Sequence, residues 1–246
     1  MEHDALGHPR PPRWRADVSP DRAVLIAAMA VVAAAMTLFT MIAEDILDGG
    51  GLISRDDATL AWFIDHRTDA LISASRTIST LGSFTSLSVF GIALGLWLWR
   101  RGVHPLLAAS PVASLCLAGI ASTIAKALFD RPRPPAEVRA AHVTLAAFPS
   151  GHATDAAGLL VAVGAVVALA IVTRPRMQVL TLVVGGAAAG AVGISRLVLG
   201  VHWLSDVVAG WALGTAVAVA AVTTSWWFTT RPPMASAGAA ASPEVG

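Results

Sequence analysis

Three short polar blocks interrupt a chain that is otherwise strongly apolar. They cover residues 126–134, 149–152 and 195–206, and each lies where a long apolar run begins or ends. Ionisable residues at such places are costly to hold in or beside a membrane, so they indicate a functional site. The residue types in the blocks define the chemistry that such a site would perform.

The blocks supply three cations and the features of an anion site. Lys126, Arg133 and Arg196 are the cations, and an arginine binds an oxyanion through two parallel hydrogen bonds. Gly151 lets the backbone approach a ligand closely. Ser150 adds a hydroxyl at the start of an expected helix, whose first N–H groups favour an anion. We expect a phosphate site that uses no metal and no cofactor.

Two histidines and an aspartate complete the set. His202 and Asp206 are four residues apart and are expected to lie one above the other on a helix face. The carboxylate would accept the Nδ1 proton and leave Nε2 as a nucleophile. His152 would then act as the general acid to the leaving oxygen. This arrangement predicts phosphoryl transfer through a phosphohistidine.

Each block also has an ordinary structural explanation. Residues 149–152 could form a helix-capping turn, and Lys126 and Arg133 could be interfacial side chains before a proline stop. His202 could be an interfacial histidine beside Trp203. The three blocks together favour a reaction centre.

Other titratable residues near the blocks are interpreted as structural. Asp155 is expected to complement the positive end of a helix. Four residues of the loop after the first block could contact a second phosphate, but solvated loop charges are the preferred interpretation: Asp130, Arg131, Arg139 and His142.

Composition places the chain in a membrane. Of 246 residues, 55% are hydrophobic and only 13% are charged, with a mean hydropathy of +0.68. Soluble domains carry about 25% charged residues, so this chain lacks the polar surface for a water-facing exterior. The net charge of +1 and the lack of a basic, aromatic stripe argue against nucleic-acid binding. Cys116 is the only cysteine, which excludes an internal disulfide.

Apolar runs of about 20 residues, the length of a membrane-crossing helix, predict an all-α bundle. The charged segment at 55–76, between the first two runs, has helical periodicity and predicts an additional amphipathic helix at the interface. Gly186 and Gly190 have the spacing of a close helix contact. The six expected transmembrane spans are residues 23–43, 81–99, 105–128, 153–173, 177–195 and 206–228.

Arginines in short loops set the expected orientation, because they favour the cytoplasmic side. If the six spans alternate, the arginine-containing loops share one side with both termini, and the three polar blocks lie on the extracytoplasmic side. We expect a polar cytoplasmic segment at 1–22, a six-helix domain at 23–230 and a disordered cytoplasmic tail at 231–246. The arginines concerned are Arg10, Arg13, Arg15, Arg22, Arg100, Arg101, Arg174, Arg176 and Arg231.

The blocks resemble the signature of the type-2 phosphatidic acid phosphatase superfamily, also called lipid phosphate phosphatases. That signature reads KxxxxxxRP, then PSGH, then SRxxxxxHxxxD, and every position matches within residues 126–206. The resemblance implies an all-helical, metal-independent phosphatase. It implies His202 as nucleophile, Asp206 as its partner and His152 as the acid. It also implies five phosphate-binding residues: Lys126, Arg133, Ser150, Gly151 and Arg196.

The expected substrate is a lipid phosphate in the bilayer. The resemblance, together with an alanine-rich and lysine-poor composition typical of high-GC bacteria, favours the bacterial cytoplasmic membrane and a polyprenyl diphosphate such as undecaprenyl or decaprenyl diphosphate. The alternatives are phosphatidylglycerol phosphate or phosphatidic acid, a lipid phosphotransferase, and a non-catalytic lipid-phosphate binder or transporter. The oligomeric state is left open.

Overall fold

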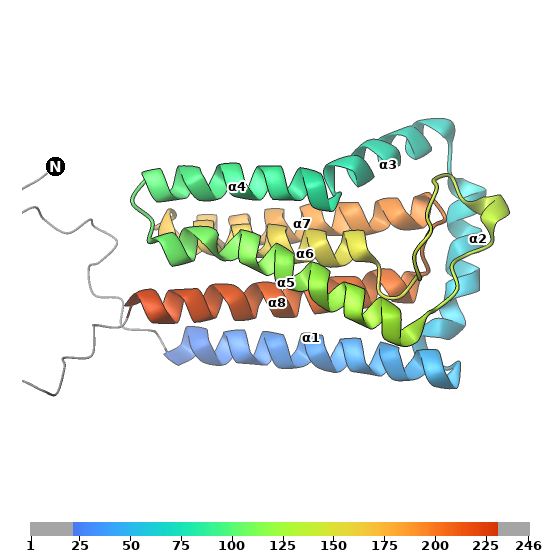
Figure 1. The fold of residues 1–246 in the computed structure, drawn as a ribbon, viewed down its shortest axis with the longest axis horizontal. Coiled ribbons are helices and arrows are strands. Elements are labelled where there is room, and N and C mark those ends of the chain that lie inside the picture. Colours follow the sequence, from blue (N-terminus) through green and yellow to red (C-terminus); the bar gives the residue numbers. More distant parts are fainter. Residues whose placement is uncertain (1–21, 231–246) are drawn as a thin grey trace, which may run out of the picture.

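The structure is a computed structural model that describes residues 22–230, so most of the expected segment 1–22 and all of the expected tail 231–246 lie outside it. All regular elements of the described residues are helical, as expected (Figure 1). They are α1 (Arg22–Asp48), η2 (Gly51–Arg55), α2 (Asp56–His66), α3 (Asp69–Leu81), α4 (Phe84–Arg100), α5 (Pro105–Phe129), η3 (Ala136–Val138), α6 (Gly151–Ala170), α7 (Pro175–Val198) and α8 (Leu204–Thr230).

Five helices are each long and apolar enough to cross a membrane: α1, α5, α6, α7 and α8. Helix α4 has 17 residues, fewer than the roughly 20 that a bilayer requires. Together α3 and α4 pass the same criterion, with a bend of 53° between them. The six expected spans are therefore found when this bent pair is taken as one span.

The segment expected as one interfacial helix at 55–76 forms two helices instead. Helix α2 ends at His66 and α3 begins at Asp69. Thr68 has extended backbone angles, and its side chain accepts the N–H of Leu71, so it caps α3 and ends the continuity. Figure 1 shows α2 lying across one end of the bundle, whereas α3 leads into α4.

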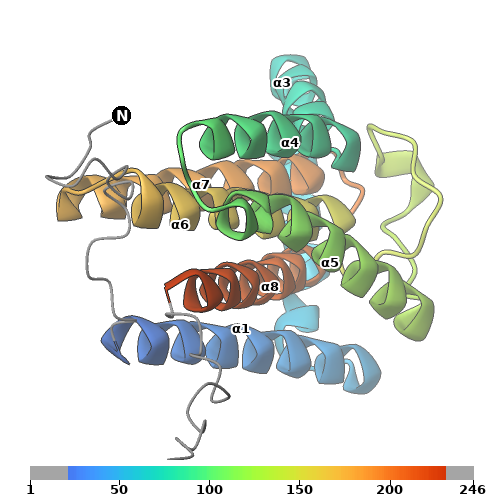
Figure 2. The same ribbon diagram turned by 60° about the vertical axis from the view of Figure 1, so that its left-hand side comes forward.

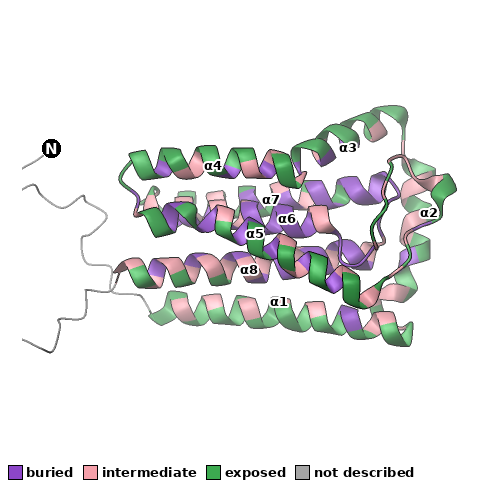
Figure 3. Ribbon diagram, in the orientation of Figure 1, coloured by how far each residue is buried: buried purple, intermediate pink, exposed green. Residues whose placement is uncertain are grey.

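Helix α6 lies at the centre of the bundle, where it contacts α5, α7 and α8. Figure 3 shows α6 and α8 mostly buried, whereas α1 is mostly exposed. Only Ile42 and Ala43 are buried on α1. Packing therefore fixes the position of α6 relative to α8 most firmly. Helix α6 carries His152, the expected acid, and α8 carries Asp206, the expected partner of His202.

Glycines bring the central helices together, but not the pair that the sequence indicated. A Cβ atom at Gly214 of α8 would lie 2.3 Å from the carbonyl oxygen of Thr154 on α6. A Cβ at Gly185 of α7 would lie 2.4 Å from the carbonyl oxygen of Leu160. Gly186 and Gly190 meet nothing within 4 Å, so the expected close contact at those two residues was wrong.

The three polar blocks lie at the same end of the bundle. Figures 1 and 2 show that end covered by α2 and by the connection between α5 and α6. The beginning of α1 and the end of α8 lie at the opposite end. The expectation that the blocks share one side is confirmed, whereas the side of the membrane that they face stays a prediction.

Candidate active site

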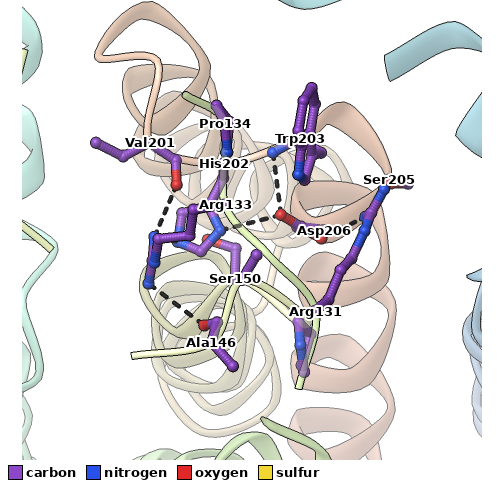
Figure 4. A network of polar contacts seen from close by, with 12 residues as sticks. Arg131, Arg133, Pro134, Ala146, Ser150, Val201, His202, Trp203, Ser205 and Asp206 are labelled. Carbon is purple, nitrogen blue, oxygen red and sulfur yellow. Dashed lines mark hydrogen bonds and ion pairs between the residues drawn. The ribbon is translucent and has the colours of Figure 1, made fainter. Parts of the chain in front are cut away.

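His202 and Asp206 form a buried pair at the start of α8. The Nδ1 atom of His202 lies 3.3 Å from Oδ2 of Asp206, and Nη1 of Arg133 lies 3.1 Å from Nε2 of the same ring (Figure 4). A guanidinium carries only donors, so Nε2 accepts and has no proton. The proton is then on Nδ1, which donates to Asp206. This is the tautomer that leaves Nε2 free to react.

The sequence indicated that His202 and Asp206 would lie on one helix face, and this prediction was wrong. His202 lies in the turn before α8, and Asp206 lies in the first helical turn. Oδ2 of Asp206 also accepts the N–H of Trp203 at 3.0 Å, so the carboxylate caps the helix while it holds the imidazole. The capping bond fixes the side chain of Asp206 independently of the histidine.

The surroundings keep the His202 ring neutral. The residue is 2% exposed, and burial lowers its pKa well below the ordinary 6.5. The positive charges of Arg133, Arg196 and Lys126 lower the pKa of His202 further. A neutral imidazole with an unprotonated Nε2 is the nucleophilic form.

Arg131 belongs to the site, so its interpretation as a solvated loop charge was wrong. Nη1 of Arg131 lies 2.6 Å from Oδ1 of Asp206, and Nη2 lies 2.7 Å from Oδ2 of Asp56. The side chain of Arg131 is only 9% exposed. It thus bridges two buried carboxylates and pairs the Asp206 oxygen that does not face His202. A buried carboxylate requires such a partner, but no pattern in the sequence showed that Arg131 would supply it.

Asp56 of α2 is the second functional residue that the sequence did not reveal. Its Oδ1 accepts the N–H of Ser205 at 2.9 Å, and its Oδ2 accepts the Ser205 hydroxyl at 2.5 Å. These bonds satisfy donors at the start of α8 and fasten α2 to it. Asp56 is 149 residues from Ser205, and no local pattern marks it.

The second block forms the start of α6. Phe148 is fully buried; its ring stacks on that of Phe39, with centroids 5.6 Å apart, and contacts that of Phe129 edge-on, with centroids 5.1 Å apart. This contact anchors the chain just before Ser150, which is the N-cap of α6. The N–H of Ser150 donates to the carbonyl of Asp206 at 2.9 Å, which joins the starts of α6 and α8.

The polar atoms of this helix start are left available to a ligand. Oγ of Ser150 is buried, and it makes no hydrogen bond with any described residue and does not cap α6. Gly151 and His152, the first two residues of α6, are half-buried. Free N–H groups, an unpaired hydroxyl and the positive end of the helix dipole all favour an anion here.

The three cations surround this helix start. Nζ of Lys126 donates to the carbonyl of Ala146 at 2.9 Å and to that of Pro149. Arg133 donates to the carbonyl of Val201 at 2.7 Å as well as to His202. Because these bonds are to neutral carbonyls, the charges remain available to an anion. The third and second blocks are thereby joined to the first.

Arg196 is the most deeply buried of the three cations. It is 4% exposed, and its Nη1 donates to the hydroxyl of Ser79 on α3. Its Nε atom has no hydrogen-bond partner among the described residues. A buried guanidinium N–H without a partner is a donor that a bound anion would satisfy.

Two of the other charged loop residues, Arg139 and His142, line a separate cavity of about 510 Å³. Arg139 donates to the carbonyl of Pro134 at 2.6 Å. Asp155 lies in the second turn of α6, beyond the first turn in which an acidic side chain complements the helix dipole. Its interpretation as a complement to the helix terminus was therefore wrong.

A groove of about 850 Å³ runs along α5 and includes Lys126 in its lining; we call it the lateral groove. It is lined by α5 residues from Cys116 to Ala127, by Phe84 of α4 and by Gly151 of α6. Its rim includes Ile120 and Ile124, both 57% exposed. An apolar groove whose lining includes the cation of Lys126 and the first residue of α6 fits a molecule with a tail and an anionic head.

Two solved structures have a similar fold. A crystal structure of a transmembrane PAP2-type phosphatidylglycerolphosphate phosphatase from Bacillus subtilis is similar, with a TM-score of 0.68 and 20% identity over 82% of this chain and 95% of that one. The crystal structure of Aquifex aeolicus LpxE has a TM-score of 0.53 and 19% identity over 68% and 94%. A comparison with curated proteins found no match.

These two likenesses concern the fold. The model of the PAP2 superfamily matches residues 107–230, which is just over half of the chain and includes all three polar blocks. With the blocks assembled at one end of a helical bundle of the same fold, the chain belongs to the PAP2 superfamily.

Proposed function

We propose that this protein hydrolyses a lipid phosphate through a phosphohistidine on His202. The observation that carries the proposal is the contact of Nε2 with Arg133, with Nδ1 turned to Asp206. A nucleophilic nitrogen thus faces the cations that would bind the phosphate. Membership of the PAP2 superfamily supports the same reaction class.

The reaction consists of two transfers. Nε2 of His202 attacks phosphorus, the bond from phosphorus to the lipid oxygen breaks, and His152 gives its proton to that oxygen. Asp206 stabilises the charged ring through Nδ1. Water then attacks the phosphohistidine while His152 takes the water's proton, which releases inorganic phosphate and restores His202. Arg133, Arg196 and the start of α6 stabilise the charge on the phosphoryl oxygens.

The substrate and its location follow from the groove and the orientation. We place the site at the extracytoplasmic face of a bacterial cytoplasmic membrane, with both termini in the cytoplasm, on the basis of the arginine distribution. The lateral groove accommodates the lipid tail. Polyprenyl diphosphate is the sequence-based candidate, and lipids with a glycerol phosphate headgroup are the second, favoured by the activity named for the Bacillus subtilis structure.

The test is phosphate release by the detergent-solubilised protein from four lipids: polyprenyl diphosphate, polyprenyl phosphate, phosphatidic acid and phosphatidylglycerol phosphate. We expect release from at least one lipid, inhibition by vanadate and full activity in EDTA. His202→Ala and His152→Ala should each abolish release, whereas the control His142→Ala should retain it. His142 is a matched control because it lines a different cavity.

Trapping the intermediate separates the possible outcomes. Brief reaction with a lipid labelled in its phosphate should label the wild type but not His202→Ala. Transfer of the label to a second lipid instead of water would identify a phosphotransferase. Binding of all four lipids without turnover would identify a binding protein and overturn the proposal, and strong inhibition by EDTA would overturn its metal-free mechanism.

A further inference from the structure

Four buried polar side-chain atoms have no hydrogen-bond partner among the described residues, and they form two pairs. Oγ of Ser150 and Nε of Arg196 belong to the expected phosphate site. Oγ of Ser122 and Oδ1 of Asp155 lie outside the family signature, and both residues line the lateral groove. Buried polar atoms are rarely left unpaired, so each pair points to a ligand atom.

The second pair lies next to the first. Ser122 is one turn before Lys126 on α5, and Asp155 is one turn after Gly151 on α6. This separation of four residues corresponds to about 6 Å along each helix at 1.5 Å per residue. A Cβ atom at Gly151 would lie 3.8 Å from Oγ of Ser122. With a phosphate bound at Lys126 and Gly151, the pair would therefore lie beside the substrate atoms that are attached to the phosphate and extend into the groove.

Both side chains are buried in the lining of the lateral groove. Ser122 is 3% exposed and Asp155 is 9% exposed. A Cβ atom at Gly119 would lie 3.5 Å from Oδ1 of Asp155, so the absence of a side chain at Gly119 leaves room beside this buried oxygen on the α5 side.

The chemistry of the pair selects its ligand. A carboxylate accepts hydrogen bonds, whereas a serine hydroxyl both donates and accepts. A ligand hydroxyl satisfies both, because it donates to Asp155 and accepts from Ser122.

We propose that Asp155 and Ser122 form a hydroxyl-binding subsite, and that the substrate is a lipid phosphate with a hydroxyl on the carbon next to the one that bears the phosphate. A glycerol phosphate headgroup has this arrangement, and a polyprenyl diphosphate does not. The proposal rests on the proposed phosphatase function and narrows its substrate class.

The test uses two lipids that differ in one hydroxyl. They are phosphatidylglycerol phosphate and the analogue in which propane-1,3-diol replaces the phosphorylated glycerol. We expect the wild type to have a kcat/KM higher by about tenfold or more for the hydroxylated lipid, the usual effect of a hydrogen bond to a charged group. Free glycerol 3-phosphate, which has the hydroxyl but no tail, should be a poor substrate because it leaves the apolar groove unfilled.

Variants assign the preference to the two residues. Asp155→Ala and Ser122→Ala should each bring the ratio of the two kcat/KM values toward one. Thr123→Val is the matched control: Thr123 lines the same groove, but its hydroxyl already donates to the carbonyl of Gly119 at 2.8 Å. This variant should keep the wild-type ratio.

The possible failures are distinguishable. A wild-type ratio near one overturns the subsite while leaving the phosphatase function intact, and this measurement needs no variant to fold. Retention of the wild-type ratio in both alanine variants overturns it as well. Turnover of neither lipid nor of phosphatidic acid or polyprenyl diphosphate overturns the proposed function, and the subsite with it.

Discussion

Nη1 of Arg131 lies 2.6 Å from Oδ1 of Asp206, on the side of the carboxylate opposite His202. Through its other nitrogen, Arg131 contacts Asp56 of α2. The orientation of the imidazole therefore depends on a chain of charged contacts that extends from the turn before α8 to a helix near the beginning of the described chain. Arg131 and Asp56 act as positioning residues in this chain.

Arg131→Lys should lower kcat by about tenfold or more with little change in KM, the typical cost of losing a group that orients a catalytic side chain. A lysine retains the charge but cannot bridge two carboxylates with a planar fork. Kinetics on the best lipid substrate would measure this.

Arg131→Met removes the charge as well. The freed carboxylate would stabilise the imidazolium of His202 more strongly, so the acidic limb of the kcat/KM profile should move to higher pH. Arg139→Lys is the control for both variants, because Arg139 donates to a carbonyl in the same loop. An unmoved acidic limb in Arg131→Met would contradict the positioning role.

Asp56→Asn should lower the free energy of unfolding by about 3 kcal/mol, because it leaves Arg131 with one fewer partner in a buried network. Asp57→Asn is a close control, since Asp57 is the adjacent residue of α2 and is exposed. Thermal unfolding in detergent, followed by tryptophan fluorescence, would compare the two. Equal effects of both variants would show that the ion pair does not stabilise the fold.

Stability should fall below pH 6.5 because of His202. Its pKa in the folded protein is well below 6.5, so between those values the unfolded chain binds a proton that the folded chain does not. The free energy of unfolding should then decrease by up to about 1.4 kcal/mol per pH unit as the pH falls. At pH above 6.5 this contribution vanishes. The variant His202→Asn should show a shallower dependence, and an identical slope in both proteins would be inconsistent with a neutral buried ring.

Gly214→Ala should destabilise the protein by about 1–3 kcal/mol and reduce activity, because the added methyl group overlaps backbone atoms of α6. The shift would separate the start of α6, with His152, from the start of α8, with Asp206. Gly186→Ala should be neutral or slightly stabilising, since its Cβ meets nothing within 4 Å. Melting temperatures and phosphate release of the two variants would test this contrast.

Much of the site could be predicted from the sequence because its chemistry depends on residue identity over short spacings. The cations, the two histidines and Asp206 all lie in the three blocks. Polar residues there indicate function because holding them in or beside a membrane costs free energy. The spans were predictable because a bilayer sets their length. Thr68, the N-cap at the break between α2 and α3, is a residue type that favours a helix start, but a single threonine is a weak signal inside an amphipathic pattern.

Only the tertiary structure decided which distant groups meet. Arg131 pairs with residues 75 positions away on either side, and no local rule distinguishes it from a solvated arginine. The contact at Gly185 instead of Gly186 depends on how α7 is rotated about its axis, which its neighbours set. Asp155 became a ligand candidate only when its Oδ1, like Oγ of Ser122 in the same groove, was found buried and unpaired. The sequence determined which functional groups are available, and the packing of α5, α6 and α8 decided which of them are left without a partner in the protein, because hydrogen bonds and burial depend on three-dimensional neighbours.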